Sequence, residues 1–174
     1  MVYASSHGHT EKIAHRLAES ARNEGVSVDV TNVTGAADTQ LADYGGVILA
    51  ASLHGGRHQR EMADWVGANR GGLAGKPTVF ISVSLTAAED SEEAREATRQ
   101  CIAEFLKETD WAPGETVPLA GALQYREYDV FTRTLMRLMM KRGGHPTDAS
   151  HDYDYTDWPA VERLGREFAM RVAR

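Results

Sequence analysis

Cysteine is almost missing from this 174-residue sequence, which contains only Cys101. A single cysteine excludes an intramolecular disulfide framework and a cysteine-rich zinc or iron–sulfur site, and it fits a reducing cytoplasm. Long apolar runs are also missing, because none approaches the roughly 20 residues that a membrane-spanning helix needs. Residues 1–6 lead directly into polar sequence without a secretory signal. We therefore expect a cytoplasmic protein, and peripheral contact with the inner face of the cell membrane stays open.

Basic residues are outnumbered, with 19 Lys and Arg against 25 Asp and Glu, which gives a formal net charge of −6. Such a chain is a poor general binder of nucleic acid unless its positive charge gathers in one place, and we predict no nucleic-acid partner. The hydrophobic share of 42% and the charged share of 25% are ordinary for a globular protein. The length suits one domain, so we predict a single domain over residues 1–174.

Strand-like and helix-like patterns alternate along the chain. Strands are expected over residues 1–4, 26–30, 46–51, 78–83 and 116–121, and helices over residues 10–24, 61–69, 90–110 and 159–172. This order predicts an α/β fold, a doubly wound five-stranded parallel sheet with helices on both faces. Asp90 and Glu93 have capping-box spacing at the third helix, and Pro118 favours a sheet edge for the fifth strand. Residues 122–158 do not fit the alternation and indicate an insertion before the last helix.

The loop after the first strand combines hydroxyl groups, a glycine and a helix start. It consists of Ser5, Ser6, His7, Gly8, His9 and Thr10. Ligands of open parallel sheets bind beyond the carboxyl ends of strands, and the free N–H groups of a helix start favour an anion such as phosphate. The loop matches neither the dinucleotide fingerprint nor the P-loop. A plain capped turn explains the same residues, and local chemistry leaves both interpretations open.

The same loop resembles the flavodoxin signature. The matching residues are Val2, Tyr3, Ser5, Gly8, Thr10, Ala14 and Leu17, whereas Met1 departs from the first position. The resemblance implies a flavodoxin-like fold that holds a flavin ring at the ends of the third and fourth strands. The candidate residues there are Ser52, Leu53, His54, Gly55, Ser84, Leu85 and Thr86. Small polar and apolar groups suit a flat ring with polar edges, although each loop also fits a plain strand-to-helix turn. Neither loop has the Trp or Tyr that shields the ring in electron carriers, so one ring face is expected to be open.

Two histidine pairs have spacings that are compatible with metal binding. His54 and His58 are four residues apart, and His7 and His9 flank Gly8. No matching carboxylate or cysteine pattern accompanies them. We therefore predict no metal and expect histidines that are solvated or hydrogen-bonded.

Positive charge gathers in the segment 122–145, which has five basic and two acidic residues, against fourteen basic and twenty-three acidic in the rest of the chain. Its apolar residues Phe131, Leu135, Leu138 and Met139 have helical spacing, which indicates a basic amphipathic helix rich in methionine. Three uses fit this helix: packing on the sheet, lying on an anionic membrane, or holding a large, flat, acidic ligand.

The late part of the chain carries a narrower resemblance. The relevant residues are Gly121, Ala122, Leu123, Tyr125 and Tyr128, then the basic helix, Gly143, Gly144, Thr147 and Asp148, and finally residues 155–158. Together with the first loop they resemble the menaquinone-dependent protoporphyrinogen dehydrogenases over nearly the whole chain. The resemblance implies FMN as cofactor, oxidation of protoporphyrinogen IX to protoporphyrin IX in heme biosynthesis, and electron delivery to menaquinone or another membrane quinone.

Basic side chains of the inserted segment are candidates for contact with the substrate propionates or with the membrane. These candidates, together with one tyrosine, are Tyr125, Arg126, Arg133, Arg137, Lys141 and Arg142. The catalytic acid and base stay unassigned, since Tyr125, Tyr128 and Asp148 are candidates by location only. The alternatives are an electron-carrier flavodoxin and an NAD(P)H:quinone reductase of flavodoxin type. The sequence leaves open whether the protein forms an oligomer.

Overall fold

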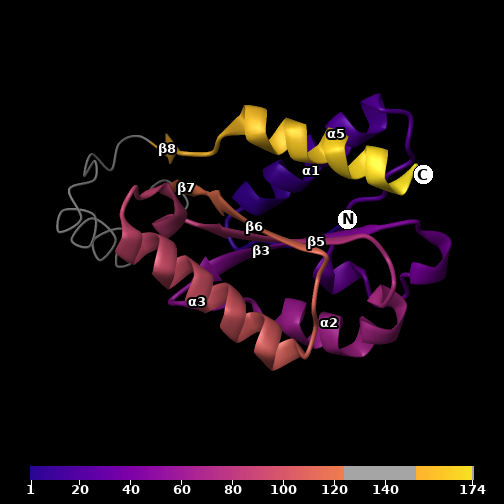
Figure 1. The fold of residues 1–174 in the computed structure, drawn as a ribbon, viewed down its shortest axis with the longest axis horizontal. Coiled ribbons are helices and arrows are strands. Elements are labelled where there is room, and N and C mark those ends of the chain that lie inside the picture. Colours follow the sequence, from indigo (N-terminus) through magenta and orange to yellow (C-terminus); the bar gives the residue numbers. More distant parts are fainter. Residues whose placement is uncertain (124–151, 174) are drawn as a thin grey trace.

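The computed structural model describes residues 1–123 and 152–173 of the chain (Figure 1). Five strands form one parallel sheet in the order β2-β1-β3-β5-β6. Their bounds are Val2–Ala4 (β1), Thr31–Asn32 (β2), Val47–His54 (β3), Thr78–Ser84 (β5) and Glu115–Ala120 (β6). This arrangement confirms the predicted doubly wound parallel sheet, with Pro118 on the edge strand β6.

Helices cover both faces of the sheet, as predicted. Helices α1 (His9–Asn23) and α5 (Trp158–Val172) lie side by side on one face, and α2 (Arg60–Leu73) and α3 (Glu92–Thr109) lie on the other (Figure 1). Three short 3₁₀ turns, η1 (Val33–Gly35), η2 (Leu41–Asp43) and η3 (Thr86–Ala88), occur in connections.

Each central strand supplies side chains to two cores, because successive residues of a strand point to opposite faces. Leu49 and Phe80 are fully buried under α2 and α3, whereas Ile48 and Ile81 are buried under α1 and α5, where they meet Leu17. Burial of one such side chain contributes about 1.5–3 kcal/mol. The two cores therefore fix the sheet and, with it, the position of every strand end.

The second strand is not where the sequence pattern placed it, so the expectation for residues 26–30 was wrong. The strand β2 begins at Thr31, which pairs with Val2, and Asn32 pairs with Tyr3. This register brings residue 30 level with Met1, whose amino group donates to the Asp29 carbonyl over 2.6 Å. Residues 26–28 consequently have no β1 backbone beside them, and their alternating valines are half-buried without forming a ladder.

The third helix is capped by a different residue from the one expected. Ser91 is the N-cap of α3, with its Oγ accepting from the Ala94 N–H over 3.1 Å. Asp90, expected in a capping box with Glu93, instead pairs with Arg95 at 2.7 Å. Ser91 has the extended backbone that an N-cap requires, so the helix begins one residue later than the capping box implies.

Two small β elements were not anticipated. The chain turns back after β3 into β4 (Arg57–His58), which pairs antiparallel with the end of β3. Further on, β7 (Ala122–Leu123) pairs antiparallel with β8 (Tyr153–Asp154), so the two ends of the inserted segment lie together. The main-chain bond from the Tyr155 N–H to the Gly121 carbonyl, 3.1 Å, joins this return to the end of β6.

Residues 124–151 lie outside the described part of the chain, and the expected basic amphipathic helix lies among them. In the ranges 1–123 and 152–173, no helix combines the length and the apolarity that crossing a membrane requires.

Candidate functional site

Three neighbouring strands end at the same edge of the sheet and bring the three predicted loops together. β1, β3 and β5 are adjacent and parallel, so residues 5–8, 52–59 and 84–88 follow one another along this edge. The inserted segment leaves and returns at the same end of the sheet, and both chain termini lie at the opposite end (Figure 1). The structure therefore gathers the predicted loops at the usual ligand position of an open parallel sheet.

The first loop ends in a helix start that has no side-chain cap. Gly8 is the N-cap of α1 with φ +78°, and within residues 1–123 and 152–173 no side-chain cap bond is made at this helix start. The first main-chain bond of the helix runs from the Lys12 N–H to the Gly8 carbonyl over 3.1 Å. The preceding N–H groups have no partner within the helix, and with the helix dipole they favour an anion. This arrangement fits the phosphate that the sequence predicted.

The His9 side chain points away from this anion position and into the protein. His9 is buried, and its Nε2 lies 2.7 Å from the Thr156 Oγ1. The Thr156 hydroxyl donates its proton to the Ala120 carbonyl over 2.9 Å, so it accepts the second bond from the His9 Nε2–H. His9 thus offers only its main-chain N–H to a ligand, while its ring joins α1 to the segment before α5.

Asp154 and Trp158 complete the surroundings of the His9 ring. The Asp154 carboxylate accepts from the Thr156 N–H and from the Trp158 Nε1, each over 3.0 Å, and lies 3.6 Å from the His9 Nε2. Burial lowers the pKa of His9 despite Asp154. Burial would raise the pKa of Asp154, but hydrogen bonds from Thr156 and Trp158, with His9 nearby, hold it below its ordinary value. A neutral imidazole therefore faces an ionised carboxylate.

The second loop is a tight hairpin and not the strand-to-helix turn that the sequence left open. Gly55 and Gly56 connect β3 to β4 with φ of +56° and +80°, the pair of positive φ values that a two-residue type I′ turn requires. Ser52, Leu53 and His54 consequently belong to the end of β3. A Gly-Gly pair directly after a strand is compatible with a two-residue hairpin, although the polar residues Arg57 and His58 that follow it have no strand pattern of their own.

Histidines from the first two loops meet at this hairpin. The His7 and His54 ring centroids are 5.6 Å apart in an edge-to-face arrangement, and the His54 Nε2 lies 3.2 Å from the Ser52 Oγ. Desolvation by the surrounding chain lowers the pKa of His54, and the adjacent His7 lowers it further. Both predicted residues, His7 and His54, therefore lie at one place between the first and second loops.

Gln59 links the same two loops, and the sequence analysis did not identify it. Its Nε2 donates to the Ser6 Oγ over 3.4 Å and to the Ser52 Oγ. Its Oε1 is buried and has no hydrogen-bond partner among the described residues, which is costly for a polar atom unless a ligand supplies a donor. Recognition of the hairpin would have placed Gln59 beside the site, since it follows β4 directly.

The His58 side chain connects the second loop to strand β5 and helix α3. Its Nε2 lies 2.9 Å from the Ser82 Oγ, and its ring contacts Phe80 and Phe105 edge-to-face at centroid distances of 5.2 and 5.1 Å. Burial lowers the pKa of His58 to about 4, so the imidazole is neutral at pH 7. His54 and His58, four residues apart in sequence, thus bond to different serines.

The third loop is shaped by its own serine. The Ser84 Oγ accepts from the Ala87 N–H over 3.1 Å and closes the turn η3. Ser84 is buried, whereas Leu85 and Thr86 are half-buried. Ser84 therefore holds the loop in place, and Leu85 and Thr86 retain exposed surface at the strand end.

The residues at this edge fit a mononucleotide with a flat ring. Uncapped N–H groups at α1 suit a phosphate, and the unpartnered Gln59 Oε1 suits an N–H or O–H donor of the ligand. Leu53 and Leu85 add apolar surface at the two neighbouring strand ends. The loop residues predicted from sequence retain exposed surface on this edge, except Ser84, His9 and Thr10, whose side chains are buried. The remaining candidates, Tyr125, Arg126, Arg133, Arg137, Lys141 and Arg142, lie outside the described residues.

Comparison with solved structures identifies the class of fold. The chain resembles oxidised flavodoxin 1 from Bacillus cereus, with a TM-score of 0.58, 19% identity and coverage of 98% of this chain and 95% of that one. It also resembles the rubredoxin oxygen:oxidoreductase of Desulfovibrio gigas, with a TM-score of 0.59, 18% identity and coverage of 99% of this chain and 35% of that one. The flavodoxin-domain model matches residues 1–150. The predicted flavodoxin-like fold is confirmed, and it implies a flavin-binding domain.

Two relatives narrow the class. The protoporphyrinogen IX dehydrogenase [quinone] of Leishmania major is 34% identical over 170 residues, covering 97% of this chain and 73% of the relative. The protein of the same name from Escherichia coli K12 is 31% identical over 169 residues, covering 97% of this chain and 93% of the relative. The chain therefore belongs to the flavodoxin-domain family and, within it, to the family of these protoporphyrinogen IX dehydrogenases, as the sequence resemblance indicated.

Proposed function

We propose that this chain binds FMN at the carboxyl ends of β1, β3 and β5, oxidises protoporphyrinogen IX to protoporphyrin IX, and passes the electrons to a quinone. The observation that carries this proposal is the similarity to two proteins of that name over 97% of the chain. The three-loop edge with its uncapped helix start supports the choice of a mononucleotide cofactor.

The first loop is proposed to hold the phosphate. Main-chain N–H groups after Gly8, together with the hydroxyl groups of Ser5 and Ser6, are the exposed donors of this loop, which contains no Lys or Arg. Hydrogen bonds from a fixed helix start bind an anion without ion pairing. The His9–Thr156 bond keeps that helix start in place against the end of β6.

The second and third loops are proposed to hold the ring. Gln59 fixes Ser6 relative to Ser52 and presents its Oε1 to the ligand. The Gly55-Gly56 turn carries no side chain that covers a ring face. In the described residues of these loops no Trp or Tyr is present, so neither loop supplies an aromatic side chain to shield a ring face.

The reaction removes six electrons and six protons from the porphyrinogen, and a bound flavin accepts two electrons at a time, which requires three successive reductions. This chain must therefore admit an acidic tetrapyrrole and an apolar quinone alternately. The neutral imidazoles of His54 and His58 add no positive charge at the ring site at pH 7. Contact of the basic segment with the substrate propionates or with an anionic membrane stays a prediction, because that segment lies outside the described residues.

The test is an anaerobic half-reaction. The purified chain is loaded with flavin, the released flavin is identified by chromatography, and the bound flavin is mixed with protoporphyrinogen IX or with NADPH while its absorbance near 450 nm is followed. We expect the released flavin to be FMN and not FAD. We expect protoporphyrinogen IX, but not NADPH, to reduce the bound flavin. Reduction by NADPH alone would support a quinone reductase, and reduction by neither would support an electron carrier. Either result, or a chain that binds no FMN, would refute the proposal.

A further inference from the structure

An open groove runs between α3 and the edge strand β6, beginning at the third loop of the site. It has a volume of about 440 Å³. Its apolar and small lining residues are Ala87, Ile102, Ala103, Leu106 and Pro118, and Thr86 lies at the loop. Thr86 belongs to the loop proposed to hold the ring, so the groove reaches that loop at one end.

The sequence of β6 and α3 explains why the groove exists. Val117 and Leu119 point into the core beneath α1 and α5, so Thr116 and Pro118 point to the α3 side, where both stay exposed. α3 presents the small side chain of Ala103 toward this edge. Helix α3 therefore does not fully cover strand β6 on this face of the sheet, which leaves room for a ligand.

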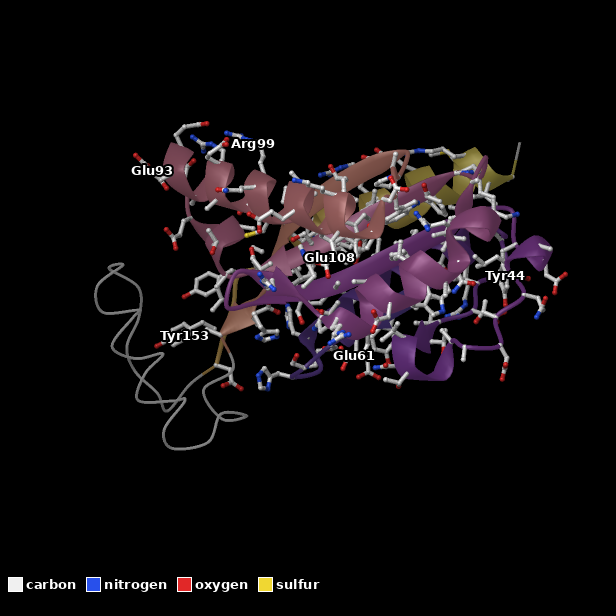
Figure 2. All side chains as sticks on the ribbon, turned by 90° about the horizontal axis from the view of Figure 1, so that it is seen from below. Tyr44, Glu61, Glu93, Arg99, Glu108 and Tyr153 are labelled. Carbon is white, nitrogen blue, oxygen red and sulfur yellow. The ribbon has the colours of Figure 1, made fainter. Side chains whose placement is uncertain are left out.

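The charges around the groove indicate what kind of ligand it takes. Arg95 and Arg99 line it, but Arg95 pairs with Asp90 at 2.7 Å, and Arg99 pairs with Glu92 at 2.6 Å and with Glu96 at 2.8 Å. Figure 2 shows Arg99 on the outer side of α3. The carboxylates engage both guanidinium groups and outnumber them, so the described residues of the groove offer no uncompensated positive charge to an acidic ligand.

We infer that this groove binds the neutral, apolar electron acceptor, a quinone with a hydrocarbon chain, and not the acidic tetrapyrrole. This inference rests on the proposed function. The quinone ring would lie at the Thr86 end, next to the flavin, and the chain would lie along Ile102, Leu106 and Pro118, where burial of apolar surface supplies the affinity. Each turnover transfers two electrons and two protons from reduced FMN to the quinone, which yields oxidised FMN and the quinol.

The test separates the oxidative half-reaction from the reductive one. The FMN-loaded chain is reduced with one equivalent of dithionite and mixed with a short-chain menaquinone, so that flavin reoxidation is measured without any porphyrinogen. Ala103→Phe fills the groove from an exposed helix position, and Ala97→Phe is the matched control, because Ala97 is exposed on the same helix but does not line the groove. We expect Ala103→Phe to raise the quinone concentration for half-maximal reoxidation by about tenfold or more, equivalent to roughly 1.4 kcal/mol, and Ala97→Phe to change it less than about twofold.

A second measurement does not depend on turnover. A photoreactive azidoquinone is cross-linked to the FMN-loaded chain, and the labelled peptides are identified by mass spectrometry. We expect label on α3 and β6 that Ala103→Phe abolishes and Ala97→Phe retains. Label confined to other segments, or unchanged reoxidation by Ala103→Phe, would overturn the inference. Slower reduction by protoporphyrinogen IX in Ala103→Phe with normal reoxidation by quinone would also overturn it, because the groove would then hold the tetrapyrrole.

Failure of the proposed function gives a different result. If protoporphyrinogen IX does not reduce the wild-type flavin, the proposed function is wrong, but the dithionite experiment still decides whether a quinone uses the groove.

Discussion

The His9 Nε2 lies 2.7 Å from the Thr156 Oγ1, and this buried bond joins two parts of the chain that are 147 residues apart. His9 begins the helix that follows the phosphate loop, and Thr156 lies where the chain returns from the inserted segment. The Thr156 hydroxyl also donates a hydrogen bond to the Ala120 carbonyl at the end of β6. The proposed anion site and the return from the insertion are therefore held by the same hydrogen-bonded group.

We predict that Thr156→Val weakens this connection. The substitution keeps the side-chain shape but leaves the His9 Nε2–H and the Ala120 carbonyl without their partner, which costs about 1–3 kcal/mol of unfolding free energy. We expect a weaker FMN affinity as well, because the helix start is less fixed. Urea unfolding and fluorescence titration with FMN measure both effects. Thr156→Ser retains the hydroxyl and serves as the control; equal stability of the Val and Ser variants would contradict the role of the bond.

We predict that Gln59→Leu lowers FMN affinity by about tenfold, equivalent to roughly 1.4 kcal/mol, with a small effect on stability. The substitution removes the donor to Ser6 and Ser52 and the unpartnered Oε1. Arg60→Leu is the control, since Arg60 is the next residue and, in the part of the chain that the structure describes, its ion pair with Asp64 at 3.6 Å is exposed. Equilibrium titration of the apo-chain with FMN measures both. Equal affinities of the two variants would show that Gln59 takes no part in the site.

We predict that stability falls in acid partly through His58. The folded-state pKa of about 4 lies below the ordinary value of 6.5, so the unfolded chain binds more protons between these values and the free energy of unfolding decreases as the pH falls. Between pH 7.5 and pH 5 the loss from this residue is on the order of 2 kcal/mol. His58→Phe should flatten the pH dependence in urea unfolding, although His9 and His54, whose pKa values are also lowered, keep part of it. An unchanged slope would contradict the burial of a neutral imidazole.

We predict that Gly165→Ala destabilises the packing of α1 against α5. A Cβ at Gly165 would lie 2.6 Å from the Leu17 carbonyl oxygen and 3.0 Å from the Ser20 Cβ, and backbone cannot move aside cheaply. The expected loss is about 1–3 kcal/mol. Gly67→Ala is the matched control, because Gly67 is exposed within α2 and a Cβ there meets nothing within 4 Å; helix propensity predicts a gain of about 1 kcal/mol. Thermal unfolding compares the two, and a Gly165 variant as stable as the Gly67 variant would be inconsistent with close helix contact.

Most of the fold could be predicted because its signals are local. The buried runs that became β3 and β5 are continuous and apolar, and α1 and α5 have one apolar stripe each, so their positions follow from periodicity alone. The prediction of a strand over residues 26–30 was wrong for a non-local reason. Its alternation is real, but a ladder needs a neighbouring strand, and the register of Val2 with Thr31 pairs β1 with residues 31–32 instead.

The site could be predicted only as far as main-chain groups and loop positions. The first loop was identified from its hydroxyl groups and its helix start, yet the direction of the His9 ring depends on Thr156, which lies 147 residues away. Gln59 escaped notice because its contacts with Ser6 and Ser52 arise from a hairpin whose signal, Gly55-Gly56, was not used. The direction of a side chain depends on contacts with residues that are distant in the sequence, and a single sequence does not reveal these contacts.

Both chain ends emerge at the edge of the sheet remote from the three loops (Figure 1). An extra domain, an affinity tag or an immobilising linker joined at either end would project away from the cofactor edge. The Leishmania major relative, of which this chain covers 73%, shows that additional sequence accompanies this domain in nature. Fusion proteins for surface attachment are therefore expected to leave the proposed cofactor site unchanged.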